Sequence, residues 1–214
     1  MTMKPEAIHE FFRRLAERTP EPRIELEYGS PYQLLVAVVL SAQTTDKGVN
    51  VATRRLFPLA PTPQAMIALG EEKVAECIKT IGFFRAKTKN VIALSGLLIE
   101  RHAGEVPSDR AALEALPGVG RKTANVVLNA IFRQPVMAVD RHVFRVANRT
   151  GIAPGKDVGE VEDMLMKIVP ADYLLDAHHW LILHGRYVCT AKKPHCLTCC
   201  AHDLCGWSDK KTHP

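Results

Sequence analysis

The chain has 214 residues and a formal net charge of +5, and this length allows one large or two small domains with cores of their own. Residues 1–18 are charged and lack the apolar region of a signal peptide, and no apolar run approaches membrane-spanning length. We therefore expect a cytoplasmic protein with no membrane partner, and we do not expect its cysteines to form an extracellular disulfide framework.

Helical periodicity dominates the sequence, and we see no convincing strand, internal repeat or low-complexity segment. Apolar residues recur at helical spacing over residues 5–18, and the prolines that follow mark a boundary. Ser30 before Pro31 is typical of a helix start, and the helix that continues to Leu40 is apolar on all sides, as in a buried core helix. Further helices are predicted over residues 46–59, 63–69, 71–80, 86–101, 158–169 and 172–188.

One segment, residues 116–123 with the sequence LPGVGRKT, joins two predicted helices that span residues 108–116 and 121–132. Its proline ends the first helix, because proline cannot continue the hydrogen-bonding pattern. Gly118 and Gly120 can adopt positive φ and let another backbone approach closely. The segment therefore predicts a tight turn between two helices.

The second of these helices begins with Arg121 and Lys122. Its first N–H groups and its positive dipole end form a good binding site for a phosphate. A solvated lysine at a plain helix–helix corner explains the segment about equally well. The segment alone does not separate the two interpretations.

Basic residues are concentrated between residues 121 and 149, where six of them accompany one acidic residue, Asp140. Arg141, Arg145 and Arg149 are four residues apart and share one face of a helix. A solvated face is the simpler interpretation, whereas a basic stripe beside a phosphate-binding helix start favours nucleic acid. Asp140, taken alone, is most simply the N-cap of the helix that carries this stripe.

Four cysteines near the C-terminal end are separated by six, two and five residues. Four thiolates this close together need a cation. Zinc held by all four is the simplest interpretation and a cubane iron–sulfur cluster is the alternative, and spacing alone does not decide between them. The four are Cys189, Cys196, Cys199 and Cys205, which leaves Cys77 and Cys200 as ordinary thiols.

Together, the LPGVGRK segment and the later run Val-Asp-Arg-His resemble the helix-hairpin-helix, Gly-Pro/Asp superfamily of DNA glycosylases, and most closely its endonuclease III branch. The resemblance covers about residues 25–205. A hairpin lysine is specific to the branch that also cuts the strand, so the resemblance implies that Lys122 is the nucleophile and Asp140 the essential carboxylate. One departure is Arg141, where the family most often has Thr, and it leaves both roles intact. The cysteine spacing matches the cluster loop of that branch residue for residue, which implies a [4Fe–4S] cluster.

The resemblance also implies contacts with DNA. The residue matching Gln43 enters the gap left by an extruded base, and an apolar residue matching Phe83 wedges into the duplex. A plain loop is the alternative for Gln43, and core packing is the alternative for Phe83. Further DNA contacts are expected at Gly118, Gly120, Arg121, Arg145, Lys192 and Lys193, the two lysines because they lie in the first gap of the cysteine loop.

The resulting hypothesis is an all-α fold with two helical domains flanking a DNA-binding cleft. Residues 24–134 form a helical domain that ends in the helix-hairpin-helix, and residues 1–23 join residues 135–214 in an iron–sulfur cluster domain. Lys122 and Asp140 are then expected on opposite walls of the cleft.

The expected substrate is double-stranded DNA that carries an oxidised or ring-saturated pyrimidine or an abasic site, bound by a monomer. The base must be flipped out of the duplex, and damage lowers that cost. The positive helix end and Arg121 disfavour the ammonium form of Lys122, whose free amine attacks C1′ as the base leaves. Resemblance then implies a Schiff base and β-elimination, which cuts the strand 3′ to the lesion.

Two alternatives belong to other classes of function. A monofunctional adenine glycosylase of the same superfamily typically lacks the hairpin lysine and has an extra C-terminal domain, whereas this chain ends soon after its cysteines. A non-enzymatic DNA-binding module with a structural zinc is the second. Iron and sulfide analysis, with incision of abasic-site DNA, discriminates between these hypotheses.

Overall fold

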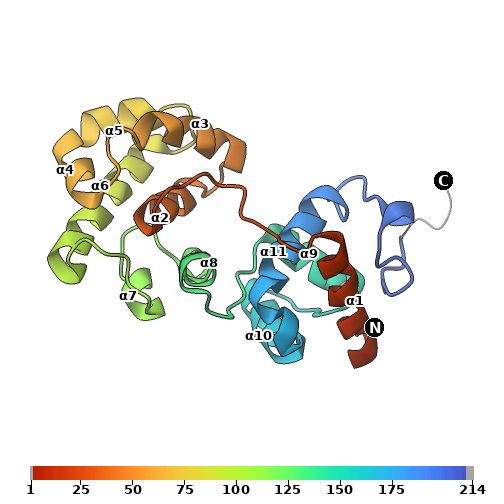
Figure 1. Ribbon diagram of the computed structural model, residues 1–214. Helices are drawn as coiled ribbons and strands as arrows, with labels where there is room; N and C mark the ends of the chain where they lie inside the picture. Colours follow the sequence, from red (N-terminus) through yellow and green to blue (C-terminus); the bar gives the residue numbers. More distant parts are fainter. Residues whose placement is uncertain (1, 211–214) are drawn as a thin grey trace. The chain divides into compact units, whose positions relative to one another are not determined.

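The computed structural model describes residues 2–210, and within them it contains eleven α-helices, one short 3-10 helix and no strand (Figure 1). The prediction of an all-α fold is confirmed. Among the same residues, no helix combines the length and the apolarity needed to cross a bilayer.

The described chain forms two compact units. The terminal unit contains residues 2–24 and 133–210, and the central unit contains residues 25–132. The first helix of the chain therefore packs with its last helices, because α1 contacts α11 within the terminal unit.

The central unit is built around α2, a helix of apolar residues that is buried along most of its length. The Ser30 side chain caps α2 by accepting a hydrogen bond from the Gln33 backbone N–H at 3.2 Å, and α3, α6 and α8 pack against it. The helices of this unit are α2 (Pro31–Leu40), α3 (Asp46–Leu56), α4 (Pro63–Leu69), α5 (Glu71–Ile78), α6 (Phe84–His102), α7 (Arg110–Glu114) and α8 (Arg121–Phe132).

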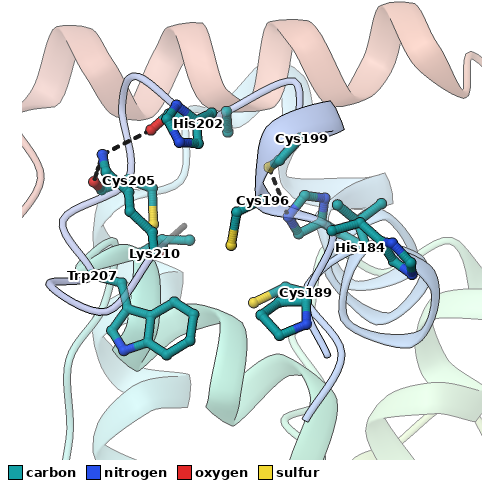
Figure 2. Close-up of a pocket in the computed structure, with 13 residues that line it drawn as sticks. His184, Cys189, Cys196, Cys199, His202, Cys205, Trp207 and Lys210 are labelled. Atoms are coloured by element: carbon teal, nitrogen blue, oxygen red, sulfur yellow. Dashed lines mark hydrogen bonds between the residues drawn. The ribbon is translucent and has the colours of Figure 1, made fainter. Parts of the chain in front are cut away.

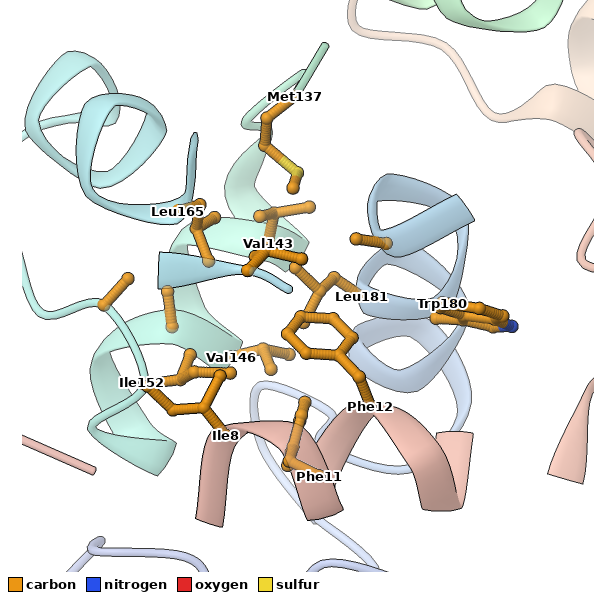
Figure 3. Packing of buried hydrophobic residues seen from close by; sticks show 14 of the residues in the cluster. Ile8, Phe11, Phe12, Met137, Val143, Val146, Ile152, Leu165, Trp180 and Leu181 are labelled. Carbon is orange, nitrogen blue, oxygen red and sulfur yellow. The ribbon is translucent and has the colours of Figure 1, made fainter. Parts of the chain in front are cut away.

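The terminal unit has a separate apolar core, in which Phe11 and Phe12 of the first helix pack against Val143, Val146 and Leu181 (Figure 3). Burial of side chains of this size contributes about 1.5–3 kcal/mol each to the free energy of folding. The core thus anchors the N-terminal helix to the last third of the chain. The helices of this unit are α1 (Pro5–Arg18), α9 (Arg141–Thr150), α10 (Val158–Ile168), α11 (Ala171–Tyr187) and the 3-10 helix η1 (Cys196–Thr198).

Predicted helix boundaries agree best where proline or a capping side chain marks them. Helices α1, α2, α4 and α8 span the predicted residues. Helices α3 and α5 end earlier than predicted, and α3 gives way to a turn in which the Leu59 N–H donates to the Leu56 carbonyl at 3.1 Å. Helix α6 begins two residues earlier than predicted. Phe83 is the residue directly before it, and its backbone is left-handed, with φ 59°.

Candidate active site and cysteine pocket

The turn between α7 and α8 requires glycine at one position. Gly118 has φ 80°, and a Cβ placed there would lie 2.9 Å from Asn90 Nδ2. A side chain at Gly118 would therefore meet both backbone strain and the α6 helix. Gly120 lies outside the left-handed region, and a Cβ at that residue would meet nothing within 4 Å.

Lys122 lies in the first turn of α8 and is exposed. The face formed by Ala124, Val127 and Leu128 is buried in the next turns of this helix, and Asn125, Val126 and Asn129 are buried as well. The packing of that face fixes the helix start, which presents Lys122 to solvent. An exposed amine on a rigid helix end has the access that a nucleophile needs.

Asp140 is the N-cap of α9. Its Oδ1 accepts hydrogen bonds from the backbone N–H groups of His142 at 2.7 Å and of Val143 at 2.9 Å. The capping interpretation is therefore confirmed, and both bonds fall on one carboxylate oxygen. Asp140 belongs to the terminal unit, whereas Lys122 belongs to the central unit.

Gln43 and Phe83 are both exposed, on two connections of the central unit. Both have left-handed backbones, with φ 55° for Gln43 and 59° for Phe83. A non-glycine residue in this region costs about 1–2 kcal/mol, and such strain concentrates at functional sites. The Phe83 side chain is 69% exposed, so the alternative of core packing is wrong for this residue.

The four cysteines predicted as ligands line one pocket of the terminal unit, and Cys200 is not part of its lining (Figure 2). Cys189 follows α11, Cys196 is the first residue of η1, Cys199 follows η1 directly, and Cys205 lies further along the chain. In the described part of the chain, no three His, Cys, Asp or Glu side chains are gathered closely enough to hold a metal ion between them. Four thiols converging on one pocket nevertheless form the donor set that an iron–sulfur cluster or zinc requires.

His184 lies deep beside this pocket, with its Nε2 3.7 Å from Cys199 Sγ. Burial lowers the pKa of His184 to about 4, so the ring is neutral at pH 7. The neutral ring is thus placed for a polar contact with one of the four pocket cysteines.

Two arginines of the basic stripe hold the cysteine loop. Arg145 donates to the carbonyl oxygens of Cys189 at 2.9 Å and Gly185 at 2.6 Å. Arg149 donates to the Thr190 and Ala191 carbonyls and lies over the Trp207 ring, with Cζ 4.2 Å from the ring centroid. These roles were missed from the sequence, because their acceptors are backbone atoms about 40 residues away.

The other residues expected at a DNA surface differ in their surroundings. Arg121 is exposed at the start of α8, as are Lys192 and Lys193 in the loop between the first two cysteines. The half-buried Arg145 has its guanidinium between backbone carbonyls. A phosphate contact by Arg145 stays a prediction, while its bracing of the cysteine loop is observed.

Comparison with known proteins identifies the class. The family described as "HhH-GPD superfamily base excision DNA repair protein" matches residues 36–171, and the chain belongs to this family. Within it, the chain is similar to endonuclease III. It is 58% identical to the endonuclease III of Escherichia coli strain K12 over 201 residues, which cover 94% of this chain and 95% of that protein. The endonuclease III of Haemophilus influenzae strain Rd is also 58% identical, with the same coverage.

A solved structure agrees with this assignment. The structure titled "Structure of a Trapped Endonuclease III-DNA Covalent Intermediate: Estranged-Adenine Complex" superposes with a TM-score of 0.90 at 44% identity. The match covers 96% of this chain and 97% of that chain. The endonuclease III fold therefore extends over both units.

Proposed function

We propose that this protein excises damaged bases from duplex DNA and then cleaves the strand, with Lys122 as the nucleophile of both steps. Base excision repair is the function of its family. The observation that carries the residue assignment is the exposed amine in the first turn of α8, directly after the glycine turn.

The chemistry follows from an amine at this position. The target base must leave the helical stack, because the C1′ atom is shielded inside a duplex. The Lys122 Nζ then bonds to C1′ while the bond from C1′ to the base breaks, and the base leaves with the electron pair. The Lys122 nitrogen then loses a proton and the C1′–O4′ bond breaks, which opens the sugar ring and leaves a Schiff base between Nζ and C1′. The Schiff base acidifies the hydrogens on C2′. Loss of one of them breaks the C3′–O bond, and the phosphate leaves with the 3′ fragment of the strand. The solved relative named above is, by its title, a covalent intermediate with DNA, which supports this route.

Asp140 is proposed to act on the same sugar as Lys122. Its carboxylate can accept the lysine proton or stabilise positive charge on the sugar. Two backbone hydrogen bonds to Oδ1 hold the group in one orientation. Such fixed orientation favours a carboxylate that stabilises charge, because it needs no rearrangement during the reaction.

The proposed substrates are oxidised or ring-saturated pyrimidines and abasic sites in double-stranded DNA, bound by a monomer in the cytoplasm. The named relatives are bacterial endonuclease III proteins. Gln43 and Phe83 are proposed to fill the gap left by the flipped base. Both are exposed on strained connections of one unit, which supports a shared role.

One experiment tests the proposed activity directly. Purified protein is incubated with a panel of duplexes that each carry one lesion, with borohydride added to reduce any Schiff base. We expect base release, strand cleavage and a protein–DNA adduct with damaged pyrimidines. Release of undamaged adenine without an adduct would instead indicate a monofunctional adenine glycosylase.

We also propose that the four pocket cysteines hold a [4Fe–4S] cluster. The donor set supports it, because four thiols line one pocket and the fifth nearby thiol, Cys200, lies outside. The cluster supplies folding free energy to a lobe with little secondary structure of its own. Iron and inorganic sulfide analysis tests this proposal, and one zinc per chain without sulfide would replace it by a structural zinc.

A further inference from the structure

A buried lysine ties together the two segments that carry Gln43 and Phe83. Lys87 lies one turn into α6 and is 5% exposed. Its Nζ donates a hydrogen bond to Thr44 Oγ1 at 2.8 Å, and its backbone N–H donates to the Phe83 carbonyl at 3.0 Å. The side chain therefore runs from the turn that begins at Phe83 to the residue that follows Gln43.

Burying the Lys87 amine is not expected to stabilise the folded protein. Lysine is almost never fully buried unless it is paired, and here the partner is a neutral hydroxyl. Burial lowers the pKa of Lys87, since the charged form is desolvated. A methionine would fill the same space without that cost. The amine is therefore expected to serve another purpose.

Gln43 and Phe83, called the two tips below, need contacts from other residues to hold their backbones in place. Gln43 and Phe83 are two of the four non-glycine residues with positive φ among residues 2–210. Strained conformations persist where the surrounding structure determines them. The exposed side chains of these two residues provide little packing of their own, whereas the bond from Lys87 to Thr44 joins their two segments.

We propose that Lys87 is a positioning residue for base flipping. By holding Thr44 against the start of α6, it keeps Gln43 and Phe83 at a fixed separation, so that both tips enter the duplex together. Preformed tips lose less conformational freedom on binding than mobile ones. This inference rests on the function proposed above, because it requires both tips to contact DNA.

Two substitutions remove the two sides of this hydrogen bond. Lys87→Met deletes the amine and Thr44→Val deletes the hydroxyl, each with a similar side-chain volume. The double variant tests whether both act through the same bond. Lys89→Met is the matched control, because Lys89 is an exposed lysine on the same helix.

The readout is a ratio of two single-turnover rate constants. One is base excision from a duplex with an oxidised pyrimidine, and the other is strand cleavage at a preformed abasic site, where no base has to be flipped. A merely structural role would lower both rate constants together, along with the Tm. A positioning role lowers the rate constant of base excision more than that of strand cleavage at the abasic site.

We expect each single variant to lower the ratio about tenfold, the double variant to lower it no further, and Lys89→Met to leave it unchanged. An unchanged ratio in both single variants, equal losses on both duplexes, or losses that multiply in the double variant would overturn the proposal. Borohydride trapping of the wild-type protein on the abasic duplex distinguishes failure of the proposed function from failure of the proposed role of Lys87. No adduct would refute the proposed function and this inference with it, whereas an adduct with an unchanged ratio refutes only the role of Lys87.

Discussion

Asp140 Oδ1 accepts a hydrogen bond from the Val143 backbone N–H at 2.9 Å, which closes the first turn of α9. A second bond, from the His142 N–H at 2.7 Å, ends on the same oxygen. The proposed catalytic carboxylate is therefore also a structural cap. Any substitution at this position has to keep the cap in order to report on the chemistry.

Asp140→Asn keeps the cap and removes the charge, because asparagine caps helices about as well as aspartate. We expect base removal to fall by about 10²-fold or more, which is the usual scale for loss of a general base or of one group that stabilises transition-state charge. The Tm should change little. Single-turnover excision and thermal denaturation measure the two effects, and wild-type turnover in this variant would leave Asp140 as a cap alone.

Lys122→Gln keeps a polar side chain of similar reach but has no amine. Borohydride trapping of the protein on damaged DNA should vanish, while binding to the same duplex persists. Lys73→Gln is the control, since Lys73 is an exposed lysine on α5. Adduct formation by Lys122→Gln at the wild-type rate would assign the nucleophile elsewhere.

Gln43→Ala removes a side chain proposed to fill the gap left by the flipped base. Unstacking a base costs a few kcal/mol, which a side chain in the gap offsets. Removal of a damaged base should therefore slow more than cleavage at a preformed abasic site. Equal losses on the two substrates would count against this role.

Cys196→Ser should abolish both the colour of the cluster and the solubility of the protein, because cluster binding supplies folding free energy. Cys200→Ser is the matched control from the same segment, since Cys200 does not line the pocket. It should keep iron, sulfide and solubility. A soluble, colourless Cys196→Ser variant with full activity would show that the cluster is dispensable.

Lys193→Ala and Arg145→Ala should differ in their effect on stability, because only Arg145 also holds the cysteine loop. Loss of one phosphate contact at the exposed Lys193 should flatten the slope of log K against log salt by about 0.9. Arg145→Ala should lower the free energy of unfolding by about 1.5–3 kcal/mol, since it deletes charged hydrogen bonds to the Cys189 and Gly185 carbonyls. Binding titrations at several salt concentrations and denaturant unfolding measure the two effects. An unchanged slope in Lys193→Ala would place that lysine away from the DNA.

Much of the fold was predictable because its signals are local. Pro5, Pro31 and Pro63 start their helices where the sequence indicated, and Ser30 and Asp140 cap theirs. Helix ends were less predictable. Helix α3 ends at Leu56 rather than at residue 59, since the last turn of a helix depends on what packs against it.

The sequence by itself determined the helical class, the glycine turn before Lys122, the cap at Asp140 and the set of four cysteines, because each depends on residue type and short spacing. Only the tertiary structure decided that Arg145 and Arg149 hold the cysteine loop, that Phe83 is exposed and that Lys87 reaches Thr44. These contacts join residues about 40 positions apart. They form only when whole helices pack, and no local propensity encodes which side chains that packing brings together.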